Sequence, residues 1–95
     1  MRVYFMVNIR IKDEQEYQLY LDRAEDVFSR YKGSYLAVDN QPAIMEGDWD
    51  YSRAVLIQFE SKADFEAWYR SADYQEILQY RLSASDCDGI LIQGK

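Results

Sequence analysis

The spacing of apolar residues changes from two to three and four near the start of the chain, and this change constrains the fold more than any other feature. Residues 2–11 alternate, so that one side carries Val3, Phe5, Val7, Ile9 and Ile11. A period of two is typical of a strand with one buried face. After Asp13 the spacing becomes helical, with an apolar stripe made of Tyr17, Tyr20, Leu21, Ala24, Val27, Phe28 and Tyr31. The chain is therefore predicted to begin with a strand and a helix.

Short-range signals predict where the helices begin and end. Asp13 with Glu16 resembles a capping box, and Ser61 with Asp64 forms a better one, followed by a helical stripe that includes Phe65, Trp68 and Tyr69. Gly33 stands where a left-handed residue would end the first helix.

The remaining segments complete a βαββαβ order. Strands are predicted at GSYLAV (33–38), RAVLIQFE (53–60) and DGILIQ (88–93), with AIME (43–46) as a further extended piece. SADYQ (71–75) predicts a break and a fresh helix start. The order is that of ferredoxin-like folds, and right-handed crossovers put the helices on one face of a four-stranded antiparallel sheet. We expect residues 1–95 to form a single α+β domain.

The sheet face opposite the helices is predicted to pair with a second copy of the chain. Alternation places on it Tyr4, Met6, Asn8, Leu56 and Gln58, which are half apolar and half hydrogen-bonding. An exposed apolar patch usually marks an interaction surface. Two sheets could meet face to face as a homodimer and enclose a cavity; an ordinary mixed surface is the alternative.

Composition argues against nucleic-acid and membrane partners. The net charge is −6 and the 11 Lys and Arg residues are scattered, whereas phosphate binding needs a basic face. No apolar run approaches the roughly 20 residues that span a bilayer, and the N-terminal stretch MRVYFMVNIRIKDE lacks the pattern of a signal peptide.

The chain has no histidine and one cysteine. Without histidine, a His-ligated haem, the usual zinc sites and the common Ser-His or Cys-His nucleophile systems are excluded. Cys87 cannot form an internal disulfide, which suits the cytoplasm, and its acidic neighbours disfavour a thiolate. We expect a cytoplasmic protein with no metal and no cofactor.

Nearly the whole chain resembles a family of small bacterial proteins known as domain of unknown function thirteen-thirty. The resemblance is carried, in this order, by YFMVNIRIKD, GSYLAV, MEGDWDYSRAVLIQFES and AWYRSADYQEILQYRLSASDCDGILIQG. That family is placed in the dimeric α+β barrel group of ferredoxin-like folds, so the resemblance implies a dimer and a ligand-sized cavity. Relatives in the group range from cofactor-independent monooxygenases and lactone isomerases to ligand-sensing domains, and the resemblance therefore supplies no reaction.

The stretch IMEGDWDYSRAV (44–55) is acidic enough to suggest a metal loop. Counted from Glu46 or from Asp48, it lacks both the sixth-position glycine and the twelfth-position glutamate of a calcium-binding EF-hand. A hairpin fits better: AIME would pair with RAVL, Glu46 would form an ion pair with Arg53, and Trp49 would fold back as a lid. Alternatively, a partly buried Arg53 would hold a substrate carboxylate, with Glu46 orienting it.

Two amides and a phenol are further candidates. Asn8 and Gln58 fall on the two central strands, taken to run parallel, where they would bind a ligand or fix the dimer register. Tyr35 is a candidate acid or base if Arg53 or Arg81 lies near it, although tyrosines more often serve in packing.

Arg81 falls on the apolar side of its helix. An arginine there needs a carboxylate or carbonyl partner, and we expect a structural ion pair with Asp86 or Asp88.

Two functions follow from these residues. The first is a homodimer that binds a small organic ligand between sheet and helices and acts as a cofactor-independent enzyme of proton transfer or oxygenation. Arg53 would hold an anionic group, Asn8 and Gln58 would orient a carbonyl, and Glu46 or Tyr35 would move a proton. Tyr4 and Trp49 would add ligand contacts. The second is a non-enzymatic ligand-binding or structural dimer, such as a stress accessory.

Overall fold

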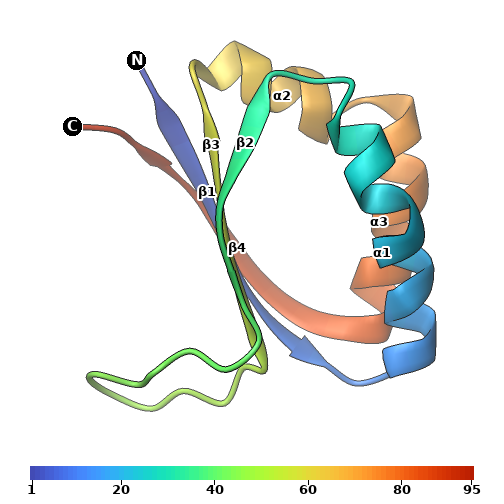
Figure 1. Cartoon of the computed structure of the whole chain (residues 1–95), viewed down its shortest axis with the longest axis vertical. Helices are drawn as coiled ribbons and strands as arrows, with labels where there is room; N and C mark the ends of the chain where they lie inside the picture. The colour runs from blue at the N-terminus through green and yellow to red at the C-terminus, as the bar shows by residue number, and fades with distance from the viewer.

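The elements of the fold follow the predicted βαββαβ order, with the second helical region split in two. The computed structural model describes residues 1–95, and its elements are β1 (Val3–Ile11), α1 (Glu14–Phe28), β2 (Gly33–Asp39), β3 (Arg53–Phe59), α2 (Lys62–Tyr69), α3 (Ala72–Ala84) and β4 (Ser85–Gln93). The strands lie in the order β2-β3-β1-β4, and all neighbours are antiparallel. The helices cover one face of the sheet and leave the other open (Figure 1). The predicted ferredoxin-like α+β fold is confirmed.

Each helix begins at a side chain that caps its first turn. The Asp13 carboxylate accepts a hydrogen bond from the amide of Glu16 at 3.1 Å, and the Ser61 hydroxyl accepts one from the amide of Asp64 at 3.1 Å. Ser71 caps α3 in the same way, so the predicted break before α3 is confirmed. Such caps satisfy amides that have no partner inside the helix. None of the helices combines the length and apolar character needed to cross a membrane.

Gly33 does not end α1, and that prediction was wrong. The helix ends at Phe28, and Gly33, which has no positive φ, opens β2. A Cβ atom on Gly33 would lie 2.5 Å from Cζ of Phe28 and 2.7 Å from Cε1 of Phe59. A glycine therefore stands here because two aromatic rings pack against the backbone, and not because the chain turns.

The segment 43–46 is not a strand, so the predicted pairing of AIME with RAVL was wrong. β3 pairs instead with β2, as far as Asp39 opposite Ala54. With this edge of β3 occupied, residues 40–52 form a long connection. In Figure 1 the connection projects past the sheet, on the side away from the helices.

The core lies between the sheet and the helices and is rich in aromatic rings. Trp68 of α2 is buried at its centre, with ring centroids 5.5 Å from Phe59 and 4.2 Å from Tyr74. The alternation predicted for the first strand is confirmed, because Val3, Phe5, Val7 and Ile9 are all buried.

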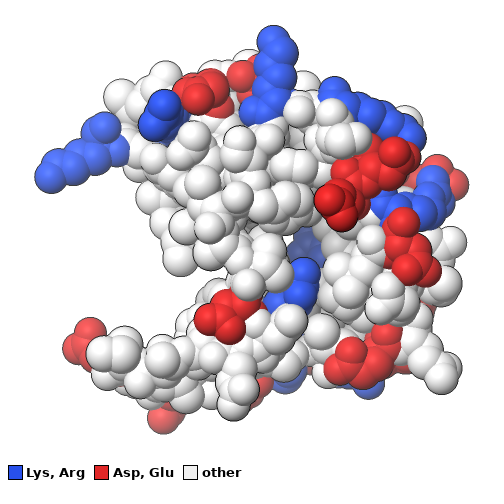
Figure 2. All heavy atoms as spheres, viewed as in Figure 1, with Lys and Arg blue, Asp and Glu red and all other residues white.

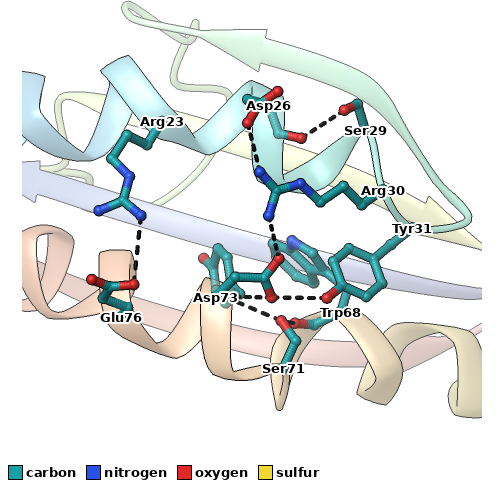
Figure 3. Close-up of polar contacts among 10 residues, drawn as sticks. Arg23, Asp26, Ser29, Arg30, Tyr31, Trp68, Ser71, Asp73 and Glu76 are labelled. Carbon is teal, nitrogen blue, oxygen red and sulfur yellow. Dashed lines mark hydrogen bonds and ion pairs between the residues drawn. The ribbon is translucent and has the colours of Figure 1, made fainter.

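A polar network on the outer surface holds α1 beside α3 (Figure 3). The Arg30 guanidinium donates hydrogen bonds to Asp26 and Asp73, at 2.8 Å each. The Tyr31 hydroxyl donates to Asp73 at 2.8 Å. Hydrogen bonds from Ser71, Tyr31 and Arg30 lower the pKa of Asp73 to about 2. The network therefore depends on an ionised Asp73.

Candidate functional site

A cavity of about 410 Å³ lies between the sheet and the helices. Its 16 lining residues come from β1, β2, β3 and all three helices, and 13 of them are hydrophobic. Sites for small organic molecules usually measure roughly 300 to 1,000 Å³ and are mainly apolar with a few polar groups. The cavity thus has the size and the lining of a small-molecule site.

A bulge in β2 shapes one wall of the cavity. Tyr35 pairs with Ile57, and Val38, three residues later, pairs with Val55. In a regular strand, residues three apart face opposite sides of the sheet. The register shift that follows Tyr35 inserts one extra residue, and both Tyr35 and Val38 thereby line the cavity.

The basic residues of the cavity each lie over a tyrosine ring. Cζ of Arg53 is 5.9 Å from the ring centroid of Tyr17, and Cζ of Arg81 is 5.7 Å from that of Tyr20. The acidic residue of the lining is the exposed Glu25. Figure 2 shows basic atoms at the hollow between the sheet and helix layers. The cavity therefore combines aromatic walls with an excess of positive charge.

The phenols of the cavity are protonated at neutral pH. Burial raises the pKa of Tyr17. Burial, followed by interaction with Tyr74, raises the pKa of Tyr20 well above its usual range. Tyr35 is 41% exposed, and its partial burial, followed by the proximity of Tyr20, also raises its pKa. These hydroxyls are suited to donate a hydrogen bond to a ligand oxygen rather than to remove a proton.

Arg53 and Tyr35 line the cavity, whereas Glu46 lies outside it. The expected Glu46–Arg53 ion pair was wrong, because 43–46 is not a strand and does not bring the carboxylate opposite Arg53. Nη1 of Arg53 donates instead to Oδ1 of Asn40 at 2.8 Å. Glu46 is exposed in the 40–52 connection.

Asn8, Gln58 and Tyr4 lie on the open face of the sheet. The strands that carry them are antiparallel, with Tyr4 opposite Gln58 and Asn8 opposite Ala54, so the expected parallel direction was wrong. The prediction, from alternation, that these residues lie on the sheet face opposite the helices is correct. The sheet separates them from the cavity, whose lining contains none of them.

Trp49 does not cover the cavity. Its ring packs edge-on against Tyr51, with centroids 5.0 Å apart, within the 40–52 connection. Trp49 is absent from the cavity lining, so the predicted lid contact is not formed over this site.

Arg81 makes no ion pair, and the predicted pairing with Asp86 or Asp88 was wrong. Asp86 lies 3.6 Å from the guanidinium of Arg10, and Asp88 accepts a hydrogen bond from the Tyr51 hydroxyl. On β4, Asp86 pairs with Arg10 and Asp88 with Asn8, so both lie on the open face of the sheet, away from α3. Arg81 is 4% exposed, and its Nε has no hydrogen-bond partner.

Sequence reasoning missed the tyrosines of α1 as site residues. Tyr17 and Tyr20 belong to the apolar stripe of the helix, which predicts a core position and no more. Two hydroxyls in one buried stripe, followed by the small Ala24, are the signal that a cavity with a few polar groups borders this helix. No group of three or more carboxylate or thiol side chains in the structure lies close enough together to hold a metal ion.

Solved structures of similar fold come from several bacteria. The RPA0582 protein of unknown function from Rhodopseudomonas palustris has a TM-score of 0.82 at 18% identity, covering 99% of this chain and 82% of that one. SnoaB, a cofactor-independent oxygenase from Streptomyces nogalater, has a TM-score of 0.71 at 15% identity, with coverages of 99% and 93%. A dimeric ferredoxin-like protein of unknown function from Thermobifida fusca has a TM-score of 0.70 at 15% identity, with coverages of 99% and 92%.

At these identities the similarity shows the fold alone. A comparison with curated proteins found no match. A family model described as Domain of unknown function (DUF1330) matches residues 2–95. The match covers nearly the whole chain, and the chain belongs to the DUF1330 family.

Proposed function

We propose that this protein is a homodimer that binds a small organic ligand in the cavity between sheet and helices. The observation that carries the proposal is the cavity itself: about 410 Å³, with 13 hydrophobic residues among the 16 that line it. A space of this size, with few polar groups, suits a ligand with an apolar body and one or two polar atoms.

The dimer is proposed to form through the open sheet face. Large apolar side chains are exposed on it, including Met6 at 39%, Ile90 at 59% and Ile92 at 40%. Ile90 pairs with Met6 across β1 and β4, and Tyr4 pairs with Ile92, so these side chains adjoin. Contiguous apolar surface of this kind favours association, and the Thermobifida fusca relative is described as dimeric. The free Cys87 is in keeping with a cytoplasmic location.

We extend the proposal to cofactor-independent chemistry on the bound ligand, either proton transfer or oxygenation. SnoaB is described as a cofactor-independent oxygenase and has the same fold. In this chain Arg53 would hold an anionic group of the ligand, and the protonated Tyr35 would donate to a developing oxyanion. Glu46, exposed outside the cavity, is not in place to move a proton there.

A non-enzymatic ligand-binding dimer is the second candidate. One observation favours it: the raised pKa values make the phenols of the cavity poor bases, and the only carboxylate that lines it, Glu25, is exposed. A cavity without a buried base binds a ligand more readily than it removes a proton from one.

A thermal-shift screen of small aromatic and aliphatic acids, phenols and amides tests ligand binding. Ala24→Leu, which adds three carbon atoms at the cavity wall, should remove the stabilisation by any hit. Ala67→Leu makes the same change at an exposed position of the neighbouring helix α2 and should leave it intact. Hits that stabilise both variants equally would place the ligand elsewhere.

Once a ligand is known, a second experiment distinguishes an enzyme from a binding protein. The hit is incubated with protein in air and in deuterated buffer, with oxygen uptake and deuterium incorporation as the readouts. Turnover that falls in Tyr35→Phe, while binding persists, would support the enzyme. A hit that binds without oxygen uptake or deuterium exchange would support the non-enzymatic binding protein.

A further inference from the structure

Arg81 is a buried cation at the cavity wall. It stands on the inner side of α3, is 4% exposed and lines the cavity. Its neighbours there are the aromatic rings of Tyr20 and Tyr74, which also line the cavity. The guanidinium lies over the Tyr20 ring, with Cζ 5.7 Å from the centroid.

No carboxylate neutralises this charge. The aspartates nearest in sequence are engaged elsewhere, Asp86 with Arg10 and Asp88 with Tyr51. Glu25, the carboxylate in the cavity lining, is exposed and forms no ion pair with Arg81. Nε of Arg81 has no partner at all. An arginine side chain keeps its charge at every physiological pH, so the charge cannot be relieved by losing a proton.

Arg53 adds a second donor without an acceptor. Its Nη1 is held by Asn40, but its Nε is buried without a partner. Buried charged groups in folded proteins are almost always paired, since an unpaired one carries a large desolvation penalty. Two guanidinium groups with free donors in one largely apolar cavity therefore indicate a partner that arrives from outside the chain.

We propose that the ligand of this cavity is a small organic anion with an aromatic or branched apolar body, whose carboxylate or enolate oxygens are bound by Arg81. The inference rests on the proposed ligand-binding function and narrows the class of ligand. Arg81 is the anchor because its guanidinium is the more buried of the two. Arg53, half-buried, assists from the same cavity. The apolar lining contacts the body of the ligand, and the protonated phenols supply further donors.

Three probes of the same shape and different charge test this inference: 2-naphthoate, 2-naphthamide and 2-naphthylmethylammonium. Calorimetry and NMR on the full chain give the affinities. We expect wild type to bind the naphthoate at least tenfold more tightly than the amide and to reject the ammonium. The Nε–Hε resonance of Arg81 should shift with the naphthoate and not with the ammonium. This readout needs no variant.

Variants separate Arg81 from general charge effects. Arg81→Met should remove the preference for the naphthoate, and Arg81→Lys should restore part of it. Arg23→Met removes a positive charge from the exposed surface of α1, where Arg23 pairs with Glu76, and should leave the preference unchanged. Folding of each variant is checked by circular dichroism, and Arg81→Gln replaces Arg81→Met if that variant does not fold.

The outcomes distinguish this inference from the proposed function. If the amide binds as tightly as the naphthoate, or Arg81→Met keeps the preference, the anion inference is overturned while the cavity remains a ligand site. If no probe of any charge binds, both are overturned. A preference that depends on Arg53 and not on Arg81 would overturn the assignment of the anchor.

Discussion

The hydroxyl oxygens of Tyr20 and Tyr74 lie 2.8 Å apart in the buried core and join α1 to α3. Each hydroxyl is the hydrogen-bond partner of the other. Both rings line the cavity, and the guanidinium of Arg81 lies over the Tyr20 ring. This pair therefore connects the packing of the helices to the geometry of the proposed site.

Removal of one hydroxyl from the Tyr20–Tyr74 pair should cost more than removal of both. Tyr20→Phe or Tyr74→Phe leaves a buried hydroxyl without its partner, and we expect a loss of about 1 to 3 kcal/mol in the free energy of unfolding. The double variant leaves neither hydroxyl unpaired and should lose less than either single variant. Urea denaturation measures this cycle, with Tyr80→Phe, which breaks no hydrogen bond between side chains, as the control. Additive losses would show that the two hydroxyls are not coupled.

Asp73 should make the protein less stable in acid. Its pKa is lowered in the folded state, to about 2 from an ordinary 3.8, by Ser71, Tyr31 and Arg30. Its contribution is therefore present above pH 3.8 and is lost as the pH falls towards 2. We expect about 1 kcal/mol or less, because the network is open to solvent. Asp73→Asn should flatten the dependence of the urea midpoint on pH in this interval, and an unchanged dependence would contradict the role of Asp73.

The features that sequence predicts correctly depend on short-range contacts. Asp13 and Ser61 each accept a hydrogen bond from an amide three residues ahead, so a capping pattern determines the helix start by itself. Alternation in β1 likewise determines which side chains share a face. These contacts need no knowledge of distant segments, and for that reason they hold in the structure.

The site depended on relations that no local pattern contains. Asn8 and Gln58 were assigned to the correct face, but the void lies on the other side of the sheet, where α1 and α3 stand. Arg53 donates a hydrogen bond to Asn40 and not to the predicted Glu46, because β2 and not segment 43–46 occupies the edge of β3. The lack of a partner for Arg81 follows from where β4 directs Asp86 and Asp88.

Gly33→Ala should destabilise the junction of β2 with α1. The added methyl would lie 2.5 Å from a ring carbon of Phe28 and 2.7 Å from one of Phe59, closer than carbon atoms approach. Overpacking of this kind costs about 1 to 3 kcal/mol, which exceeds the roughly 0.4 to 1 kcal/mol that alanine contributes by restricting the unfolded chain. Ser34→Ala, at the next and exposed position, is the control in thermal unfolding. A stabilised Gly33→Ala would mean that the rings move aside freely.

Ile90→Lys should convert the proposed dimer into a monomer. Ile90 is 59% exposed on the open face, and a lysine there would bring a charge into an apolar interface. We expect the dissociation constant of the dimer, measured by sedimentation velocity, to rise at least tenfold. Leu82→Lys makes the same change on α3, where the leucine is 55% exposed, and should leave the dimer intact. If the wild-type protein sediments as a monomer both at high concentration and after 100-fold dilution, the proposed dimer is contradicted.

Arg81→Met should stabilise the ligand-free protein. The variant removes a buried charge that has no counter-charge and keeps an unbranched apolar side chain in its place. Because such a charge carries a desolvation penalty, we expect a gain of about 1 to 3 kcal/mol in the free energy of unfolding. Arg53→Met should gain less, since it also breaks the hydrogen bond to Asn40. Urea denaturation without ligand measures both. A gain would mean that Arg81 lowers stability for the sake of binding, as functional residues often do, whereas a loss would make its contact with the Tyr20 ring a structural one.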